Sequence, residues 1–254
     1  MDFLFDQLYL FVISFIANTL SAMAGGGAGL LQFPALIFLG LPFTYALATH
    51  KIATVALGLG ATLKHSKENH LNLKFSCFIL ACGLPGVILG AHTIVHIPEY
   101  IAKLSLGVLT VGLGVFSLFK PKLGQTSEIK ANTRYRITIG GLTLCLLGFF
   151  NGSLTSGTGL FVTLWLVTWF GLDFKKATAY TMILVGLFWN GSGALTLALI
   201  TPVQWSWLPA LILASAIGGY LGATLGLKYG NQLIKRFFEI ITISVGLSLI
   251  ASSY

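Results

Sequence analysis

Two glycine-rich runs are the parts of this sequence best suited to bind a ligand. The first contains Gly25, Gly26, Gly27 and Gly29; the second contains Asn151, Ser153, Thr155, Ser156, Gly157 and Thr158. Glycine costs about 1 kcal/mol relative to alanine inside a helix, so each run predicts that a helix is interrupted there.

The interruptions favour anion binding. A helix that restarts near Gly29 or Gly159 has unpaired amide groups and a positive dipole end, which suit an oxyanion. The hydroxyls of Ser153, Thr155, Ser156 and Thr158 would complete its shell. The alternative interpretation is that the glycines only let helices pack closely.

Lys51 is the most informative charged residue, and Thr49 and His50 share its helical turn. A lysine at the bilayer centre costs about 2.5 to 3.5 kcal/mol, which favours a functional role in substrate binding. Alternatively, its side chain reaches the outer interface by snorkelling. Asn190 lies at a similar depth in the second half and either contributes to the same site or bonds a neighbouring helix.

The elements that position these residues are membrane spans. The chain has 254 residues, is 56% hydrophobic and 9% charged, and has a mean hydropathy of +0.88. This composition predicts an all-α polytopic membrane protein. The net charge of +8 comes from basic clusters between apolar spans, which indicates cytoplasmic loops and no nucleic-acid partner. The three cysteines match neither a metal site nor a disulfide framework, so we expect no metal.

An internal repeat divides the chain. Gly27 and Gly29 recur as Gly157 and Gly159 at an offset of 130 residues, and similar matches continue towards the end of the chain at an offset of 132. We predict a first transmembrane repeat over residues 1–122, a cytoplasmic linker over 123–135 and a second repeat over 136–254.

The distribution of lysine and arginine selects the topology. Residues 8–40 and 136–171 are each too long for one crossing, so each is expected to enter and return on the same side. With the N-terminus outside, this arrangement places 13 of the 15 basic residues inside, whereas a single crossing by each segment places only 8 inside. Three further crossings follow each broken hairpin, so the two repeats are inverted. The expected crossings are residues 52–63 (beginning nearer Thr44), 75–91, 101–119, 178–200, 208–227 and 237–252.

The first glycine run and its surroundings resemble the sulfite exporter TauE/SafE family. The resemblance rests on Ala24–Leu30, Pro34, Gly40-Leu-Pro42 and Ala46–Ile52, and it extends over essentially the whole chain. Two departures are His50, where many members have Asn or Ser, and Tyr180-Thr181-Met182 in the second copy. The resemblance implies a multi-pass permease of the bacterial inner membrane that moves a small anion such as sulfite or an organosulfonate. It implies no enzymatic activity and no cofactor.

We therefore expect a secondary transporter that exports a small anion by alternating access between the inverted repeats. Export of a monoanion from a negative interior gains about 2.3 kcal/mol per 100 mV, so it needs no coupled ion. The sequence leaves open an importer or ion-coupled symporter, a passive channel, a membrane assembly subunit and a homo-oligomer. No carboxylate is expected deep in a span, and Glu239 is expected to pair with Lys235 and Arg236 at the interface.

Overall fold

The computed structural model describes residues 3–68, 71–94, 98–128, 133–154 and 157–251, and every regular element in these ranges is a helix. Five of the helices are long and apolar enough to cross a membrane. The predicted all-α polytopic membrane fold is therefore confirmed.

The first half begins with a helix that is broken at the glycine run. Its elements are α1 (Phe3–Ala24), the 3-10 turn η1 (Ala28–Leu30), α2 (Gln32–Phe38), α3 (Phe43–Glu68), α4 (Leu73–Thr93) and α5 (Glu99–Leu118). The break lies where it was predicted, but α2 begins at Gln32 and not near Gly29. The 3-10 turn η1 occupies the positions before Gln32, so α2 starts later in the sequence than predicted.

The second half repeats this opening. Its elements are α6 (Arg134–Ser153), α7 (Thr158–Thr168), α8 (Phe174–Tyr180), the π-helical segment η3 (Thr181–Trp189), α9 (Asn190–Ile200), the 3-10 turn η4 (Trp205–Trp207) and α10 (Leu208–Ala251). The helix α7 begins at Thr158, close to the predicted restart.

Several predicted boundaries agree with the structure and others change. The helix α3 begins at Phe43, in agreement with a start nearer Thr44. The span expected over 178–200 begins at Phe174 and contains the π-helical segment. The last two expected spans are joined in α10, which bends at Gly230, where φ is +82°. Glycine allows this positive φ, so the chain turns without a loop.

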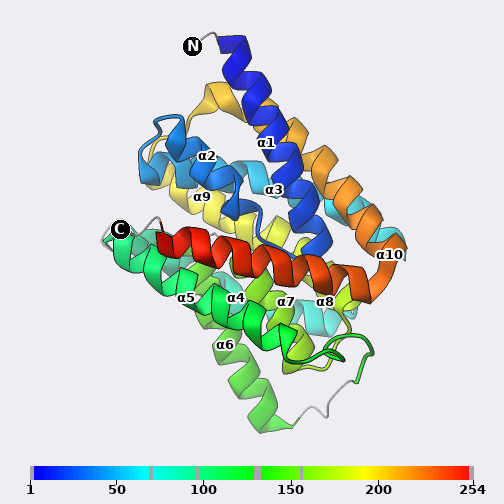
Figure 1. Cartoon of the computed structure of the whole chain (residues 1–254). Helices are drawn as coiled ribbons and strands as arrows, with labels where there is room; N and C mark the ends of the chain where they lie inside the picture. Colours follow the sequence, from blue (N-terminus) through cyan, green and yellow to red (C-terminus); the bar gives the residue numbers. More distant parts are fainter. Residues whose placement is uncertain (1–2, 69–70, 95–97, 129–132, 155–156, 252–254) are drawn as a thin grey trace.

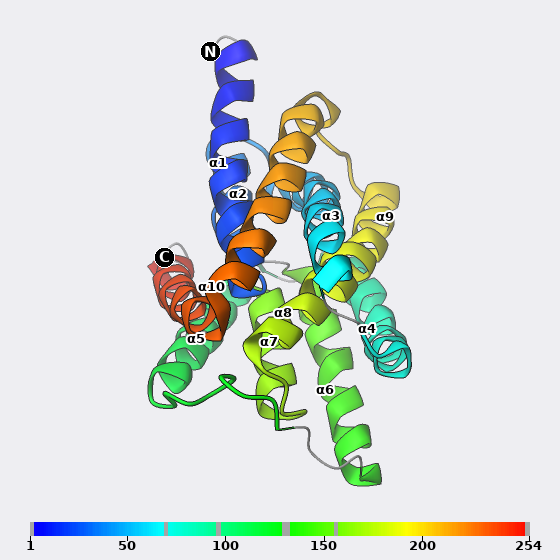
Figure 2. The ribbon, with the colours of Figure 1, turned by 90° about the vertical axis from the view of Figure 1, so that its right-hand side faces the viewer.

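The two opening helices enter the molecule from opposite ends. In Figures 1 and 2, α1 descends from the N-terminus at the top and α6 rises from the bottom, and both end near the middle. The helix α1 lies along the part of α10 before Gly230, and α5 lies beside the part after it. These opposed directions are those that inverted repeats require, and the repeat symmetry itself stays a prediction.

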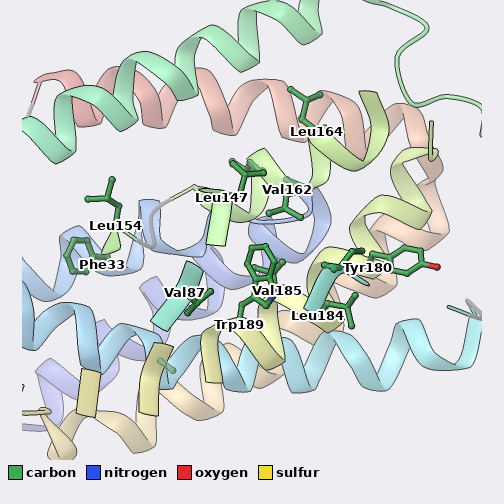
Figure 3. Close-up of a cluster of buried hydrophobic side chains, with 14 of the residues drawn as sticks. Phe33, Val87, Leu147, Leu154, Val162, Leu164, Tyr180, Leu184, Val185 and Trp189 are labelled. Carbon is green, nitrogen blue, oxygen red and sulfur yellow. The ribbon is translucent and has the colours of Figure 1, made fainter. Parts of the chain in front are cut away.

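Glycines and a large aromatic residue shape the core between the halves. Trp189 is fully buried, and a Cβ atom at Gly83 of α4 would lie 1.7 Å from its Cζ2 atom. Figure 3 shows Trp189 beside Val185, Val87 and Leu184 in this core. The small residue on α4 therefore makes room for the indole at the end of the π-helical segment.

A buried ion pair of α10 packs against α5, the last helix of the first half. Lys235 pairs with Glu239, and Ser117 of α5 donates a hydrogen bond of 2.9 Å to the Glu239 carboxylate. The predicted pair with Lys235 is confirmed, but it lies buried against α5 and not at an exposed surface. The described part of the linker also contacts the second half, because Phe174 N donates to Gly124 O over 2.8 Å.

Candidate functional site

The two glycine breaks meet in the middle of the molecule. Gly25, Gly26 and Gly27 have φ values of +83°, +144° and +100°, and Gly157 has +75°. A Cβ atom at Gly26 would lie 2.5 Å from the backbone atoms Gly159 C and Leu160 N. Only glycine allows both this backbone conformation and this close approach. The breaks therefore bring backbone from both halves to one point.

A side chain of α7, the helix after the second break, holds the two halves together. Thr163 of α7 donates a hydrogen bond of 2.7 Å to Gly25 O, and its hydroxyl lies 2.8 Å from that of Thr181. The carbonyl group at the end of α1 thus has a partner, which a buried helix end requires.

Lys51 is completely buried, and its neighbours are neutral. Its ammonium group donates to Asn151 Oδ1 over 2.8 Å and to Asn190 Oδ1 over 3.1 Å. Among the described residues, no carboxylate pairs with it. The interpretation that Lys51 snorkels to the outer interface is wrong, because the helix α3 directs its side chain between α6 and α9.

The hydrogen bonds of Lys51 orient the two asparagine amides. Because Lys51 donates hydrogen bonds to both amide oxygens, the NH₂ groups of the two asparagines point away from Lys51. Asn151 Nδ2 donates to Thr158 Oγ1 over 3.0 Å and to Asn190 Oδ1 over 3.3 Å. Within the described part of the chain, Asn190 Nδ2 donates to no other side chain or backbone group. It remains available as a donor to a ligand.

A small cavity lies between the breaks and the asparagines. Its volume is about 30 Å³, which gives room for roughly two water molecules. Its lining residues are Ser21, Gly26, Gly27, Ala28, Gly29, His50, Thr54, Leu57, Asn151, Thr158, Gly159, Thr181, Met182, Val185, Gly186 and Asn190. Lys51 is not a lining residue; it lies behind Asn151 and Asn190. Positions separated by 130 or 131 residues, such as Gly29 and Gly159, or His50 and Thr181, line it together.

One hydroxyl of the cavity is unsatisfied. Ser21 Oγ is buried and has no hydrogen-bond partner among the described residues. A buried polar group without a partner costs roughly 1 to 3 kcal/mol, so the Ser21 hydroxyl favours a ligand that accepts a hydrogen bond from it. Thr158 and Gly159, at the start of α7, add the positive end of a helix dipole to the same cavity.

His50 connects the cavity to a second polar cluster. His50 Nδ1 lies 2.8 Å from Gln32 Oε1, and Gln32 Nε2 donates to Ser14 Oγ over 3.0 Å. Asn18 donates to Ser215 of α10 over 3.0 Å in the same cluster. These buried bonds connect α1, α2, α3 and α10 behind the cavity wall.

The structure brings most of the predicted site residues together and places others elsewhere. Gly26, Gly27, Gly29, His50, Asn151, Thr158 and Asn190 line the cavity, and Lys51 lies behind it. Thr49 instead accepts a bond from Gln204 N, and Ser153 bonds Phe149 O in its own helix. Gly25 and Gly157 shape the breaks without lining the cavity. Thr155 and Ser156 lie outside the described residues.

Sequence reasoning missed several polar residues of the site. Ser21, Gln32, Thr54 and Thr181 were not predicted, although Gln32 is a polar residue in an apolar stretch. That isolation is a detectable signal, because a polar side chain inside a membrane protein generally needs a partner or a function. Ser21 and Thr181 carry no such signal, since hydroxyl residues also bond their own helices in membranes.

Comparisons with known proteins place the chain among membrane transporters. The sequence model of the family described as sulfite exporter TauE/SafE matches residues 10–249. A probable membrane transporter protein of Sinorhizobium sp is 32% identical, and the alignment covers 96% of this chain and 92% of that protein. A probable membrane transporter protein of Haemophilus influenzae is also 32% identical, with 95% and 94% covered. The corresponding Escherichia coli protein is 27% identical, with 96% and 90% covered. No solved structure matches the chain significantly.

Proposed function

Because the chain belongs to the sulfite exporter TauE/SafE family, and so is a membrane transporter of that type, we propose that it exports a small sulfur oxyanion or organosulfonate bound in the cavity between the two glycine breaks. The protein is a multi-pass membrane protein. We place it in the bacterial inner membrane and assign it no enzymatic activity.

The observation that carries this proposal is the burial of Lys51 without an acidic partner. An ammonium group loses several kcal/mol of solvation free energy when it is buried. Hydrogen bonds to neutral amide oxygens compensate for only part of this loss. Asn151 and Asn190 are the side chains that accept its hydrogen bonds. An anion in the adjacent cavity supplies the missing negative charge, so substrate binding and charge neutralisation are one event.

The donors around the cavity favour an oxyanion. Asn190 Nδ2, the Ser21 hydroxyl and the first amides of α7 are hydrogen-bond donors that could bind an anion in the cavity. Sulfite and the sulfonate group present three oxygen acceptors in a compact shape, which suits several converging donors. The cavity of about 30 Å³ is smaller than such an anion, so we assign this conformation to a closed state.

The position of the cavity between the halves supports alternating access. Gly26 touches the backbone of Gly159, and Gly58 of α3 packs against the backbone of Gly186. Movement of one half against the other would open these contacts on one side at a time. Export is the favoured direction, because the inside-negative potential drives an anion outwards by about 2.3 kcal/mol per charge per 100 mV.

Flux into and out of vesicles tests the proposal. Purified protein in liposomes is expected to carry sulfite and methanesulfonate with saturable kinetics and to move them faster away from a negative interior. Lys51→Met should lower the flux by at least about tenfold, because removal of the charge costs more than 1.4 kcal/mol of binding. Lys67→Met is the matched control, since Lys67 is exposed at the other end of α3.

The rival functions give different results in the same vesicles. Flux proportional to anion concentration without saturation would indicate a channel. Flux that ignores the membrane potential would contradict export driven by the potential and favour an electroneutral symporter. Equal flux by the Lys51→Met and Lys67→Met proteins would overturn the assigned site.

A further inference from the structure

His50 is the ionisable side chain that lines the cavity. Among the described lining residues, the others are glycines, hydroxyl residues, asparagines and apolar residues. Lys51 supplies a charge from behind the asparagines, whereas His50 itself faces the space that the anion would occupy. Within the described wall of the cavity, a change in charge must therefore come from the His50 ring.

The hydrogen bonds behind His50 fix which ring nitrogen faces the cavity. Gln32 Nε2 donates to Ser14 Oγ over 3.0 Å and lies 3.4 Å from Ser215 Oγ, so Gln32 Oε1 is the acceptor for His50. His50 Nδ1 lies 2.8 Å from this oxygen, so we assign the ring hydrogen of neutral His50 to Nδ1. The other nitrogen, Nε2, is left towards the cavity, where it accepts a hydrogen bond when neutral and donates one when protonated.

Among the residues that the structure describes, the surroundings of His50 contain one other charged group. Lys51 is its neighbour on α3, Gln32 and the Phe33 ring face it from α2, and Ser21 shares the cavity from α1. Within the described residues, η1, α6, α7, η3 and α9 place no ionisable side chain on the cavity. A proton on His50 is therefore repelled by Lys51 in the empty site and becomes favourable when negative charge enters.

We propose that the site takes divalent oxyanions together with one proton, which binds to His50 Nε2. This inference rests on the proposed function and adds the charge of its substrate. Lys51 balances one negative charge, and protonated His50 balances the second. A monovalent anion needs only Lys51, so it binds while His50 stays neutral. Binding of the proton and of the divalent anion strengthen each other by the same factor, as linkage requires.

The bound proton also allows a divalent anion to be exported with its charge partly balanced. It enters the site from the same side as the anion and leaves on the opposite side with it. The loaded site then moves one net negative charge outwards, and the inside-negative potential still drives the step. A divalent anion alone would leave one charge unbalanced in the interior of the protein, which is costly there.

Proton uptake upon binding tests the proposal with two defined probes. Thiosulfate is divalent and methanesulfonate is monovalent, and both stay fully ionised in the range where histidine titrates. Each is added to purified protein in weakly buffered detergent solution near neutral pH, and a pH indicator reports the protons taken up. Thiosulfate should bind with uptake of a proton, and methanesulfonate should bind with little uptake.

Three histidine variants locate the proton. His50→Gln and His50→Arg should both abolish the uptake that thiosulfate causes, and thiosulfate should bind to His50→Arg with an affinity that no longer changes with pH. His92→Gln, at an exposed position near the end of α4, should behave as the wild type.

The outcomes separate this inference from the proposed function. Wild-type protein that binds thiosulfate without proton uptake, or that takes up equal amounts with both probes, overturns the role of His50 while leaving the anion site intact. Proton uptake that persists in the His50→Arg protein would also overturn the role of His50 and leave the anion site intact. If neither probe binds to the wild type, the anion site itself is wrong, and both proposals fall together.

Discussion

Lys51 Nζ donates to Asn190 Oδ1 over 3.1 Å, and this bond joins a helix of the first half to a helix of the second across the centre of the molecule. The two residues are separated by 139 positions in the chain. Both asparagine partners of Lys51 belong to the second half, so its charge is held by the halves acting together. A movement between the halves would therefore change the environment of this charge.

Removal of Asn190 should destabilise the protein only while Lys51 is present. Asn190→Leu leaves the buried ammonium with Asn151 as its partner, and the loss should lower the free energy of unfolding by about 1 to 3 kcal/mol. The double variant Lys51→Met with Asn190→Leu should recover most of this loss, because an apolar pair of similar volume needs no solvation. Thermal unfolding in detergent measures both, and additive losses would contradict the coupling.

Gly26→Ala should abolish transport, because the new Cβ atom would lie 2.5 Å from the backbone of Gly159 and Leu160. The φ of +144° adds backbone strain of the order of 1 to 3 kcal/mol. The matched control is Gly191→Ala, next to Asn190, where a Cβ atom would meet nothing within 4 Å. Vesicle flux and expression level should fall for the first variant and stay near the wild-type values for the second.

The sequence predicted the membrane class and the helix breaks and pointed to Lys51 as a candidate site residue, because each leaves a local signal. A glycine run interrupts a helix wherever it occurs, and a lysine in an apolar stretch stands out in any context. The direction of the Lys51 side chain left no such signal. It depends on Asn151 and Asn190, which the fold brings to α3 from distant parts of the chain.

The roles of Thr49 and His50 illustrate the same limit. They are adjacent in the sequence and were assigned to one site, yet Thr49 bonds the loop at Gln204 and His50 faces the cavity. Neighbouring helical residues point about 100° apart, so sharing a turn does not mean sharing a surface. The π-helical segment η3 was also not predicted, because an apolar run has the same composition in a π-helix and in an α-helix.

The buried pair of Lys235 and Glu239 should matter more for stability than an exposed pair. Glu239→Leu leaves the Lys235 ammonium buried with Ser117 O as its remaining acceptor, and it should cost about 3 to 5 kcal/mol of unfolding free energy. The control pair is Lys176 and Asp173, whose atoms lie 3.7 Å apart and whose lysine is half exposed. Lys176→Met should cost about 1 kcal/mol or less. Similar melting temperatures for the two variants would contradict the difference.

The inverted topology predicts that two exposed positions lie on opposite sides of the membrane. Lys176, beside the start of α8, is expected to face the cytoplasm, and Tyr100, at the start of α5, is expected to face outwards. Single cysteines at these positions, in a protein without Cys77, Cys82 and Cys145, should react with an impermeant maleimide from opposite sides. Intact cells should label Tyr100→Cys, and inside-out vesicles should label Lys176→Cys. Labelling of both cysteines in intact cells would require an even number of crossings between them, and the two halves would then not be inverted copies as predicted.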